Sequence, residues 1–211
     1  MIAVVCAVPA ERRALSGLAG PELSVHLSGM GAAAAERTAS SLVDAAPAAV
    51  ISAGFCGALA DDLRVGDLVV AQEVLDERTG DRFAADAHLL EAAPGRRGVI
   101  VSAERIARTP SDRARLDGLA VDLESAAIAR VARAAGIPFI ALRAVTDERR
   151  HRLPDFDRIM DAAGRLTPGA GIVHFVLHPR EVPALVRLGP AVRRAGQALR
   201  EGLERMLEAL R

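Results

Sequence analysis

One unit of the chain, residues 121 to 147, restricts the fold more than any other. Apolar residues recur at helical spacing after Ser125, a candidate N-cap whose hydroxyl can accept a free backbone N–H. Gly136 then fits a helix C-terminus that needs a left-handed residue. A mostly apolar run, residues 139 to 145, has the length of a buried strand. The unit therefore predicts a helix, a tight turn and a strand of an α/β sheet.

Polar residues stand before the predicted helix and after the predicted strand of this unit. Thr146 and Asp147 follow the strand, and Glu124 precedes the helix. Ligands of open α/β sheets bind beyond the carboxyl ends of the strands. We therefore expect Glu124 and Asp147 to face one cleft.

The rest of the chain repeats this alternation of strands and helices, which predicts a single α/β domain over residues 1–211 with a largely parallel sheet. Further strands are expected near residues 2–8, 25–27, 49–53, 67–71 and 98–102. Helices are expected after Pro9 and over residues 32–43, 86–92 and 181–211.

Composition excludes several classes of function. The 211 residues are 51% hydrophobic with a formal net charge of zero, so nothing points to a nucleic-acid partner. Lys, Tyr and Trp are all absent, which removes Schiff-base lysines, a phosphate-loop lysine and tyrosine acid–base catalysis. The five histidines lack metal-ligand spacing, so no metal is expected. Cys6 and Cys56 fit buried thiols in a reducing cytoplasm, where we expect the protein.

Position alone leaves two interpretations open for several segments. Glu11 is either a first-turn acid that suits the helix dipole, which position favours, or a site residue. The turn at 28–31 either seats an anion or allows close packing. Residues 103–118 are expected to be solvated, and 162–171 to be a mobile loop.

The tail, residues 181–211, carries apolar residues at helical spacing and an excess of Arg over Glu. Such a basic amphipathic helix can lie on an anionic membrane, but packing on the domain or on a partner subunit is commoner. Gly189 and Pro190 are expected to break or kink it.

Four blocks, in this order and at this spacing, resemble the nucleoside phosphorylase/nucleosidase family. They are residues 7–11, residues 28–31, residues 52–59 with 65–67, and residues 122–124 with 143–147. The resemblance implies a three-layer α/β/α fold with a mixed, largely parallel sheet. It also implies cleavage of the N-glycosidic bond of a purine nucleoside, with adenine as the favoured base, by a homodimer or larger homo-oligomer.

The resemblance assigns roles residue by residue. Asp147 matches the general acid that protonates the base, which requires its pKa to rise by about 3 units from about 3.9. Glu124 matches the carboxylate that binds the ribose hydroxyls, and Leu123 stands where many relatives have a sugar-packing Met. Glu11 matches the acid that handles water, and Arg143 an arginine that orients the nucleophile or a neighbouring carboxylate.

Other site residues follow from the same blocks. Gly54, Phe55 and Thr146 are expected to bind substrate, although relatives have small residues at Phe55 and Cys56. Arg12, Ser28 and Gly31 are candidates for a phosphate site. Inorganic phosphate is the only co-substrate expected, no cofactor is, and the choice between water and phosphate stays open.

The segment after Asp147 resembles a narrower branch, the hopanoid-biosynthesis-associated phosphorylases. The matching features are Leu153-Pro154, the glycine-containing segment 164–171 and the Arg-rich helix that begins near Pro183. The branch implies a lipid-linked adenosine such as adenosylhopane as substrate, with peripheral membrane contact through the tail. A non-catalytic nucleoside- or lipid-binding module on the same fold is the alternative.

Overall fold

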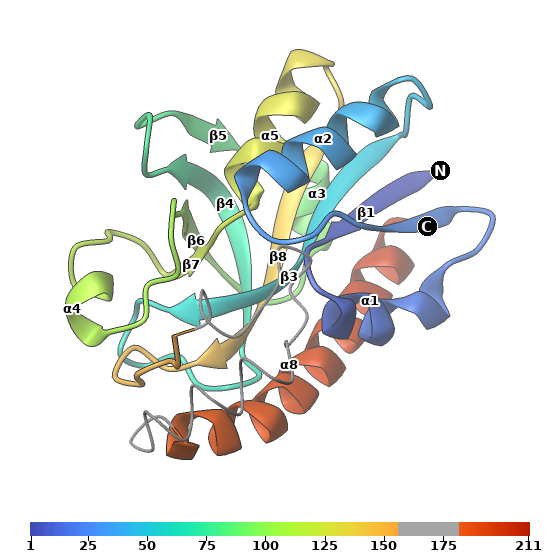
Figure 1. Ribbon diagram of the computed structural model, residues 1–211. Helices are drawn as coiled ribbons and strands as arrows, with labels where there is room; N and C mark the ends of the chain where they lie inside the picture. The colour runs from blue at the N-terminus through green and yellow to red at the C-terminus, as the bar shows by residue number, and fades with distance from the viewer. Residues whose placement is uncertain (156–181) are drawn as a thin grey trace.

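A computed structural model describes residues 1–155 and 182–211 (Figure 1). The described residues form eight strands, and helical elements separate consecutive strands except between β3, β4 and β5. The strands are β1 (Ile2–Cys6), β2 (Leu23–Leu27), β3 (Ala49–Ala58), β4 (Leu68–Asp76), β5 (Arg82–Ala84), β6 (Arg96–Ser102), β7 (Ala120–Asp122) and β8 (Phe139–Asp147). The helices are α1 (Pro9–Leu15), the 3-10 turn η1 (Ser16–Leu18), α2 (Ala32–Val43), α3 (Ala87–Ala92), α4 (Pro110–Arg113), α5 (Ser125–Ala134) and α8 (Val182–Ala209).

The strands form one mixed sheet that closes on itself. Strand β3 pairs with β7 and β8, β8 pairs with β4, and β6 links β4 to β7, so these five strands complete a ring. Strands β1 and β2 extend the sheet beyond β3, and β5 extends it beyond β4. The β1–β2, β1–β3, β3–β8, β4–β6 and β6–β7 pairs are parallel, whereas β3–β7, β4–β5 and β4–β8 are antiparallel.

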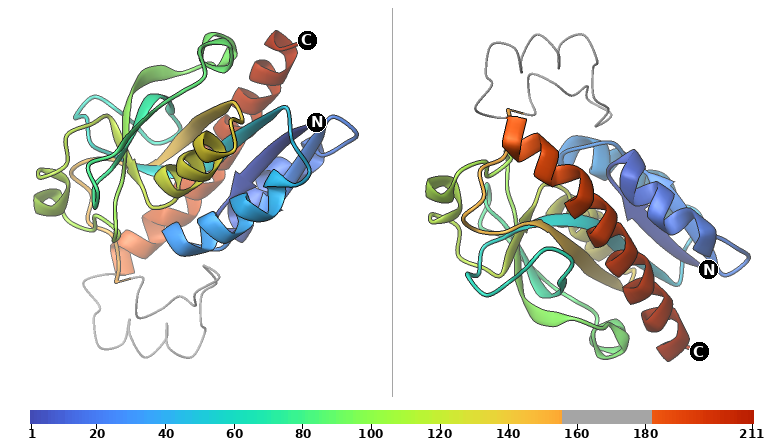
Figure 2. Two further views of the ribbon diagram at one scale, coloured as in Figure 1. Left: turned by 90° about the horizontal axis from the view of Figure 1, so that it is seen from above. Right: turned by 90° about the horizontal axis from the view of Figure 1, so that it is seen from below.

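Helices cover both faces of this sheet, which confirms the predicted three-layer class (Figure 2). The buried residues of α2 and α5 pack in one apolar cluster on the sheet. Those of α1, α3 and α8 pack in a second cluster on the opposite face. The mostly alanine surfaces of α2 and α5 suit close packing, since small side chains let a helix approach the strands.

Several local predictions are confirmed and others are corrected. Helix α2 spans the predicted residues, and Gly136 has φ +66° at the end of α5. Ser125 is not the N-cap: it is the first helical residue, and its backbone N–H donates to Asp122 at 3.3 Å. Residues 103–118 are not simply solvated, because they contain α4, whose Arg113 is completely buried. Residues 162–171 lie outside the described part of the chain.

The tail forms a single helix, α8, which continues through Pro190 rather than breaking there. Pro190 is exposed, so water can solvate the carbonyl that loses its helical partner, and the next turns are held by packing. Ala195, Leu199, Leu203 and Met206 are fully buried against the sheet. The apolar face of α8 is thus used within the domain, and no helix of the described residues could cross a membrane.

Candidate active site

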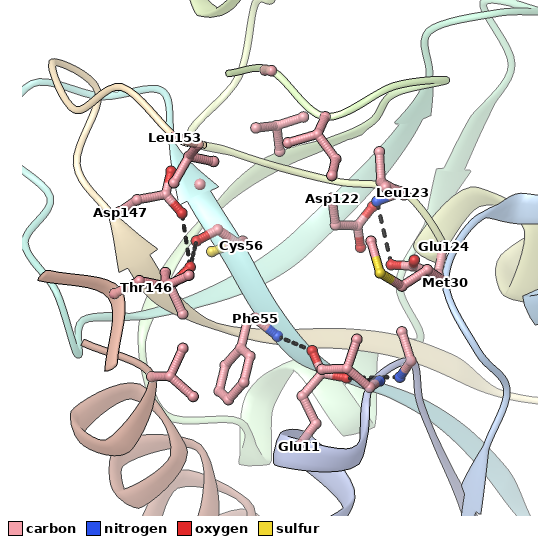
Figure 3. Close-up of a pocket in the computed structure, with 18 of the residues that line it drawn as sticks. Glu11, Met30, Phe55, Cys56, Asp122, Leu123, Glu124, Thr146, Asp147 and Leu153 are labelled. Atoms are coloured by element: carbon pink, nitrogen blue, oxygen red, sulfur yellow. Dashed lines mark hydrogen bonds between the residues drawn. The ribbon is translucent and has the colours of Figure 1, made fainter. Parts of the chain in front are cut away.

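A cavity of about 210 Å³ opens where β3 and β8 end, the position expected for a ligand site (Figure 3). Four carboxylates line it, from Glu11, Asp122, Glu124 and Asp147. The remaining wall is largely apolar and comes from the loop before α4, from the ends of the central strands and from α8. The apolar lining residues include Ala7, Val8, Met30, Phe55, Ile106, Ala107, Val121, Leu123, Leu153, Leu188 and Val192.

Asp147 ends β8 and is 6% exposed. Its Oδ1 accepts the Thr146 hydroxyl at 2.8 Å, and its Oδ2 accepts from the guanidinium of Arg113. Burial raises the pKa of Asp147, while the charge of Arg113 and the two side-chain hydrogen bonds act against that rise. An upward direction is the one that a general acid needs near neutral pH.

Glu124 lies on the other side of the cavity, at the N-terminus of α5 (Figure 3). Its Oε1 accepts the backbone N–H of Gly31 at 2.8 Å, which links it to the turn before α2. Burial, followed by the charge of Asp122, raises the pKa of Glu124 to about 7, against the pull of Arg143. Leu123 lines the cavity beside it, as a residue that packs against a sugar would.

Glu11 occupies the first turn of α1, where its carboxylate is held on both oxygens. Its Oε2 accepts the N–H groups of Ala7 at 2.7 Å and Val8 at 2.9 Å, and its Oε1 accepts that of Phe55 at 2.6 Å. Burial raises the pKa of Glu11, which Arg143 and these donors oppose. The side chain therefore joins α1 to β3 and also lines the cavity, so both interpretations of Glu11 describe part of its position.

Arg143 is buried beneath the cavity and is not among the residues that line it. Its Nε donates to Asp122 at 2.7 Å, and its Nη2 donates to Ser52 at 2.7 Å and Ser125 at 2.8 Å. Nη2 also lies 2.5 Å from Asp122. Arg143 therefore contacts the Asp122 carboxylate directly, and its role in the reaction stays a prediction.

Gly54 lies behind the site rather than in its wall. A Cβ atom here would lie 2.5 Å from both Glu11 Oε1 and Arg143 Nη1, so only glycine lets these two groups approach. Phe55 follows it and lines the cavity, with its ring against α8 near Gly196. Thr146 lines the cavity beside Asp147. Its hydroxyl contacts Asp147 and also donates toward the Cys56 carbonyl at 3.2 Å.

The three candidate phosphate residues do not meet in the cavity. Arg12 is exposed on α1, and the Ser28 hydroxyl donates to the Cys6 and Gly29 carbonyls. Gly31 offers its N–H to Glu124 instead of to an anion. In the described residues, no group of His, Cys, Asp or Glu has the arrangement of a metal site.

Sequence reasoning missed Arg113 and underused Asp122. Arg113 lay in a segment of mixed charge that resembled a solvated surface, and nothing local marks it as buried. Asp122 did carry a signal, because it immediately follows two strand-like residues and precedes Leu123 and Glu124. Met30 also lines the cavity from the 28–31 turn, whose interpretation had stayed open.

Comparisons with known proteins identify the family of this chain. The family model of the phosphorylase superfamily matches residues 3–167. A 5′-methylthioadenosine/S-adenosylhomocysteine nucleosidase from Shewanella putrefaciens is 30% identical over an alignment of 179 residues, covering 70% of this chain and 78% of that protein. The chain therefore belongs to the phosphorylase superfamily, within the nucleoside phosphorylase/nucleosidase family.

Solved structures show the same fold at lower identity. Futalosine hydrolase of Helicobacter pylori has a TM-score of 0.75 at 16% identity, covering 98% of this chain and 97% of that one. A 5′-methylthioadenosine/S-adenosylhomocysteine nucleosidase from Neisseria meningitidis, in complex with methylthio-immucillin-A, also has a TM-score of 0.75, at 20% identity and 98% coverage of both chains. The family prediction is confirmed, and the hopanoid branch stays a prediction.

Proposed function

We propose that this chain cleaves the N-glycosidic bond of a purine nucleoside and releases adenine. The observation that carries the proposal is one cavity with Asp147 on one side and Glu124 on the other, both buried and both with raised pKa. A purine anion leaves poorly, so the base must gain a proton as the bond breaks. Two buried carboxylates on opposite sides of one cavity can supply an acid for the base and a charge for the sugar.

The reaction divides between these groups. Protonated Asp147 gives its proton to N7 of the purine while the electrons of the C1′–N9 bond pass to the base. Glu124, in its ionised form, binds the ribose hydroxyls and stabilises the positive charge that develops on the sugar. Water then attacks C1′, and Glu11 accepts the proton that the water loses.

Hydrolysis is favoured over phosphorolysis by the positions of the residues. Glu11 lines the cavity, whereas Arg12, Ser28 and Gly31 do not, and Gly31 already binds Glu124. The Shewanella relative is also a nucleosidase by name. Phosphorolysis remains the second candidate, because the superfamily includes phosphorylases.

The apolar wall favours a substrate with an apolar 5′ group. Phe55, Leu188 and Val192 line the cavity, two of them from α8, and Ile106 and Leu153 add further apolar surface to its wall. Such a wall suits a thioether or a hydrocarbon chain, because burial of apolar surface stabilises the complex. A lipid-linked adenosine is therefore kept as a candidate beside methylthioadenosine, with membrane contact and a homo-oligomer as further expectations.

Base release measured by chromatography tests the proposal. The substrates are adenosine, methylthioadenosine, a 5′-alkyl adenosine with a long chain, and inosine, each with and without phosphate. Adenine release without phosphate supports hydrolysis, and release only with phosphate supports phosphorolysis. Asp147→Asn should remove turnover while the circular dichroism spectrum stays unchanged. Full activity of this variant contradicts the proposed acid, and tight binding without release by the wild type supports the binding-module alternative.

A further inference from the structure

Arg113 is a fully buried guanidinium next to the proposed general acid. It is the last residue of α4, and its side chain has no exposed surface. Burial of a permanent charge is costly unless partners satisfy it, so its contacts carry information. Those contacts lie at one end of the candidate cavity, which Arg113 itself helps to line.

The guanidinium connects three parts of that cavity. Its Nε donates to the Ala107 carbonyl at 3.0 Å, in the loop that forms one wall. Its Nη1 donates to the Glu148 carbonyl at 2.5 Å, just after β8. Its Nη2 donates to Asp147 Oδ2. Arg113 thus holds the wall, the strand end and the carboxylate in one fixed geometry.

The carboxylate of Asp147 is oriented from both sides. Thr146 donates to Oδ1 and Arg113 to Oδ2, so each oxygen already has a donor. Gly57 makes the approach possible, because a Cβ atom there would lie 2.9 Å from Oδ2 and 3.7 Å from the Cζ of Arg113. The arrangement favours the ionised carboxylate, whereas burial and an acid role favour the protonated one.

We propose that Arg113 is a positioning residue that orients the Asp147 carboxyl group and sets the pH range over which it can donate a proton. This inference rests on the proposed function for its catalytic meaning, but the coupling of the two side chains does not. Burial raises the pKa of Asp147, so the carboxyl group can hold a proton. The positive charge of Arg113 stabilises the carboxylate that forms when this proton passes to the base. In this proposal Arg113 acts through Asp147 and does not bind the substrate.

Other charged and titratable groups around Asp147 are weaker partners. His151 acts in the same direction as Arg113 but is partly exposed, and the Cys56 thiol on β3 is uncharged at neutral pH because burial raises its pKa well above the ordinary value. A second cavity of about 280 Å³ adjoins the site and brings three exposed arginines near Asp147, namely Arg152, Arg187 and Arg194. Water screens exposed charges, so the buried Arg113 dominates.

Carbon-13 NMR of aspartate-labelled protein tests the coupling without any turnover. The Asp147 carboxyl resonance is assigned from its loss in Asp147→Asn, then titrated in wild type, Arg113→Met and Arg113→Lys. Removal of an opposite charge in direct contact should raise the Asp147 pKa by about 1–3 units in Arg113→Met. Arg113→Lys should shift it less, and Thr146→Val serves as a matched control that removes the neutral donor. A shift below about 0.3 units in folded Arg113→Met would overturn the proposal.

Kinetics then separate positioning from a structural role. In Arg113→Met the alkaline limb of the kcat profile should move up with the Asp147 pKa, and kcat should fall at its optimum. A structural role alone would lower kcat equally at every pH and leave the limb in place, which contradicts the proposal. If Arg113→Met does not fold, the same limb is read in Arg113→Gln, which also removes the charge but keeps a hydrogen-bond donor, and an unmoved limb with an unmoved carboxyl titration overturns the proposal. A wild type without base release refutes the proposed function, while the titration still decides whether Arg113 controls Asp147.

Discussion

Replacing Arg143 with Met tests how the polar floor of the site is held together. Arg143 is 2% exposed and makes four contacts of 2.5–2.8 Å, two of them with Asp122. Arg143→Met would leave the buried Asp122 without its ion-pair partner, and among the described residues the Ser125 N–H and hydroxyl would be its remaining donors. Removing one partner of a buried pair costs about 3–5 kcal/mol. A domain has about 5–15 kcal/mol of stability, so the loss is a large fraction.

Urea unfolding followed by circular dichroism measures this loss. With a slope of about 2–3 kcal/mol/M, the midpoint should fall by about 1–2.5 M. The double variant Asp122→Leu with Arg143→Met should recover most of the stability, because an apolar pair of similar volume replaces the ion pair. The reasoning is refuted if Arg143→Met loses less than about 1 kcal/mol, or if the double variant is no more stable than the single one.

The pH dependence of Arg143→Met provides a second check on the same cause. Arg143 lowers the pKa of both Glu11 and Glu124, so its removal should raise both values further. A carboxyl group whose folded pKa lies above its unfolded value stabilises the fold at low pH and loses that contribution as pH rises. The variant should therefore lose stability more steeply than wild type between pH 5 and 8, and equal slopes would contradict this.

Three further variants probe the site and its support. The pKa of Glu124 is about 7 in the fold and 4.5 for the free group. Wild type should therefore lose about 3 kcal/mol of stability from this group as the pH rises from 4.5 to 7.5. Glu124→Gln should not show this loss when urea unfolding is measured at each pH. Gly54→Ala should lower stability by about 1–3 kcal/mol by crowding Glu11 and Arg143, while Gly20→Ala, which meets no atom within 4 Å, should be neutral in thermal melts. Leu199→Ala should cost about 2–5 kcal/mol in unfolding experiments, because α8 packs on the sheet, and the exposed Val186→Ala should cost little; equal effects would show that α8 does not support the core.

The alternation of elements could be predicted because it depends on local pattern. Residues 32–43 carry helical spacing and follow a glycine turn, and helix α2 spans those same residues. The extent of β3 could not be predicted, because Gly54 and Gly57 resemble a strand end. They continue the strand because β8 pairs with both of them. The missing side chains also leave room for the carboxylate of Glu11 beside Gly54 and for that of Asp147 beside Gly57.

The candidate site divides in the same way. The positions of Glu124 and Asp147 follow from sequence, since both stand at element ends that must meet at one edge of the sheet. The environment of Asp147 does not follow, because Arg113 is 34 residues away and its side chain reaches Asp147 only in the folded chain. The antiparallel pairs that close the ring of strands are likewise set by long-range contacts.

The sequence by itself determined the α/β class, the family and the carboxylates at the ends of the strands. These depend on local periodicity and on short motifs that can be read along the chain. Only the tertiary structure decided that Arg143 lies beneath the cavity against Asp122, that Arg113 holds Asp147, and that α8 covers the sheet. A buried charge is stable only beside partners that satisfy it, and those partners are brought together by folding and not by their spacing in the chain.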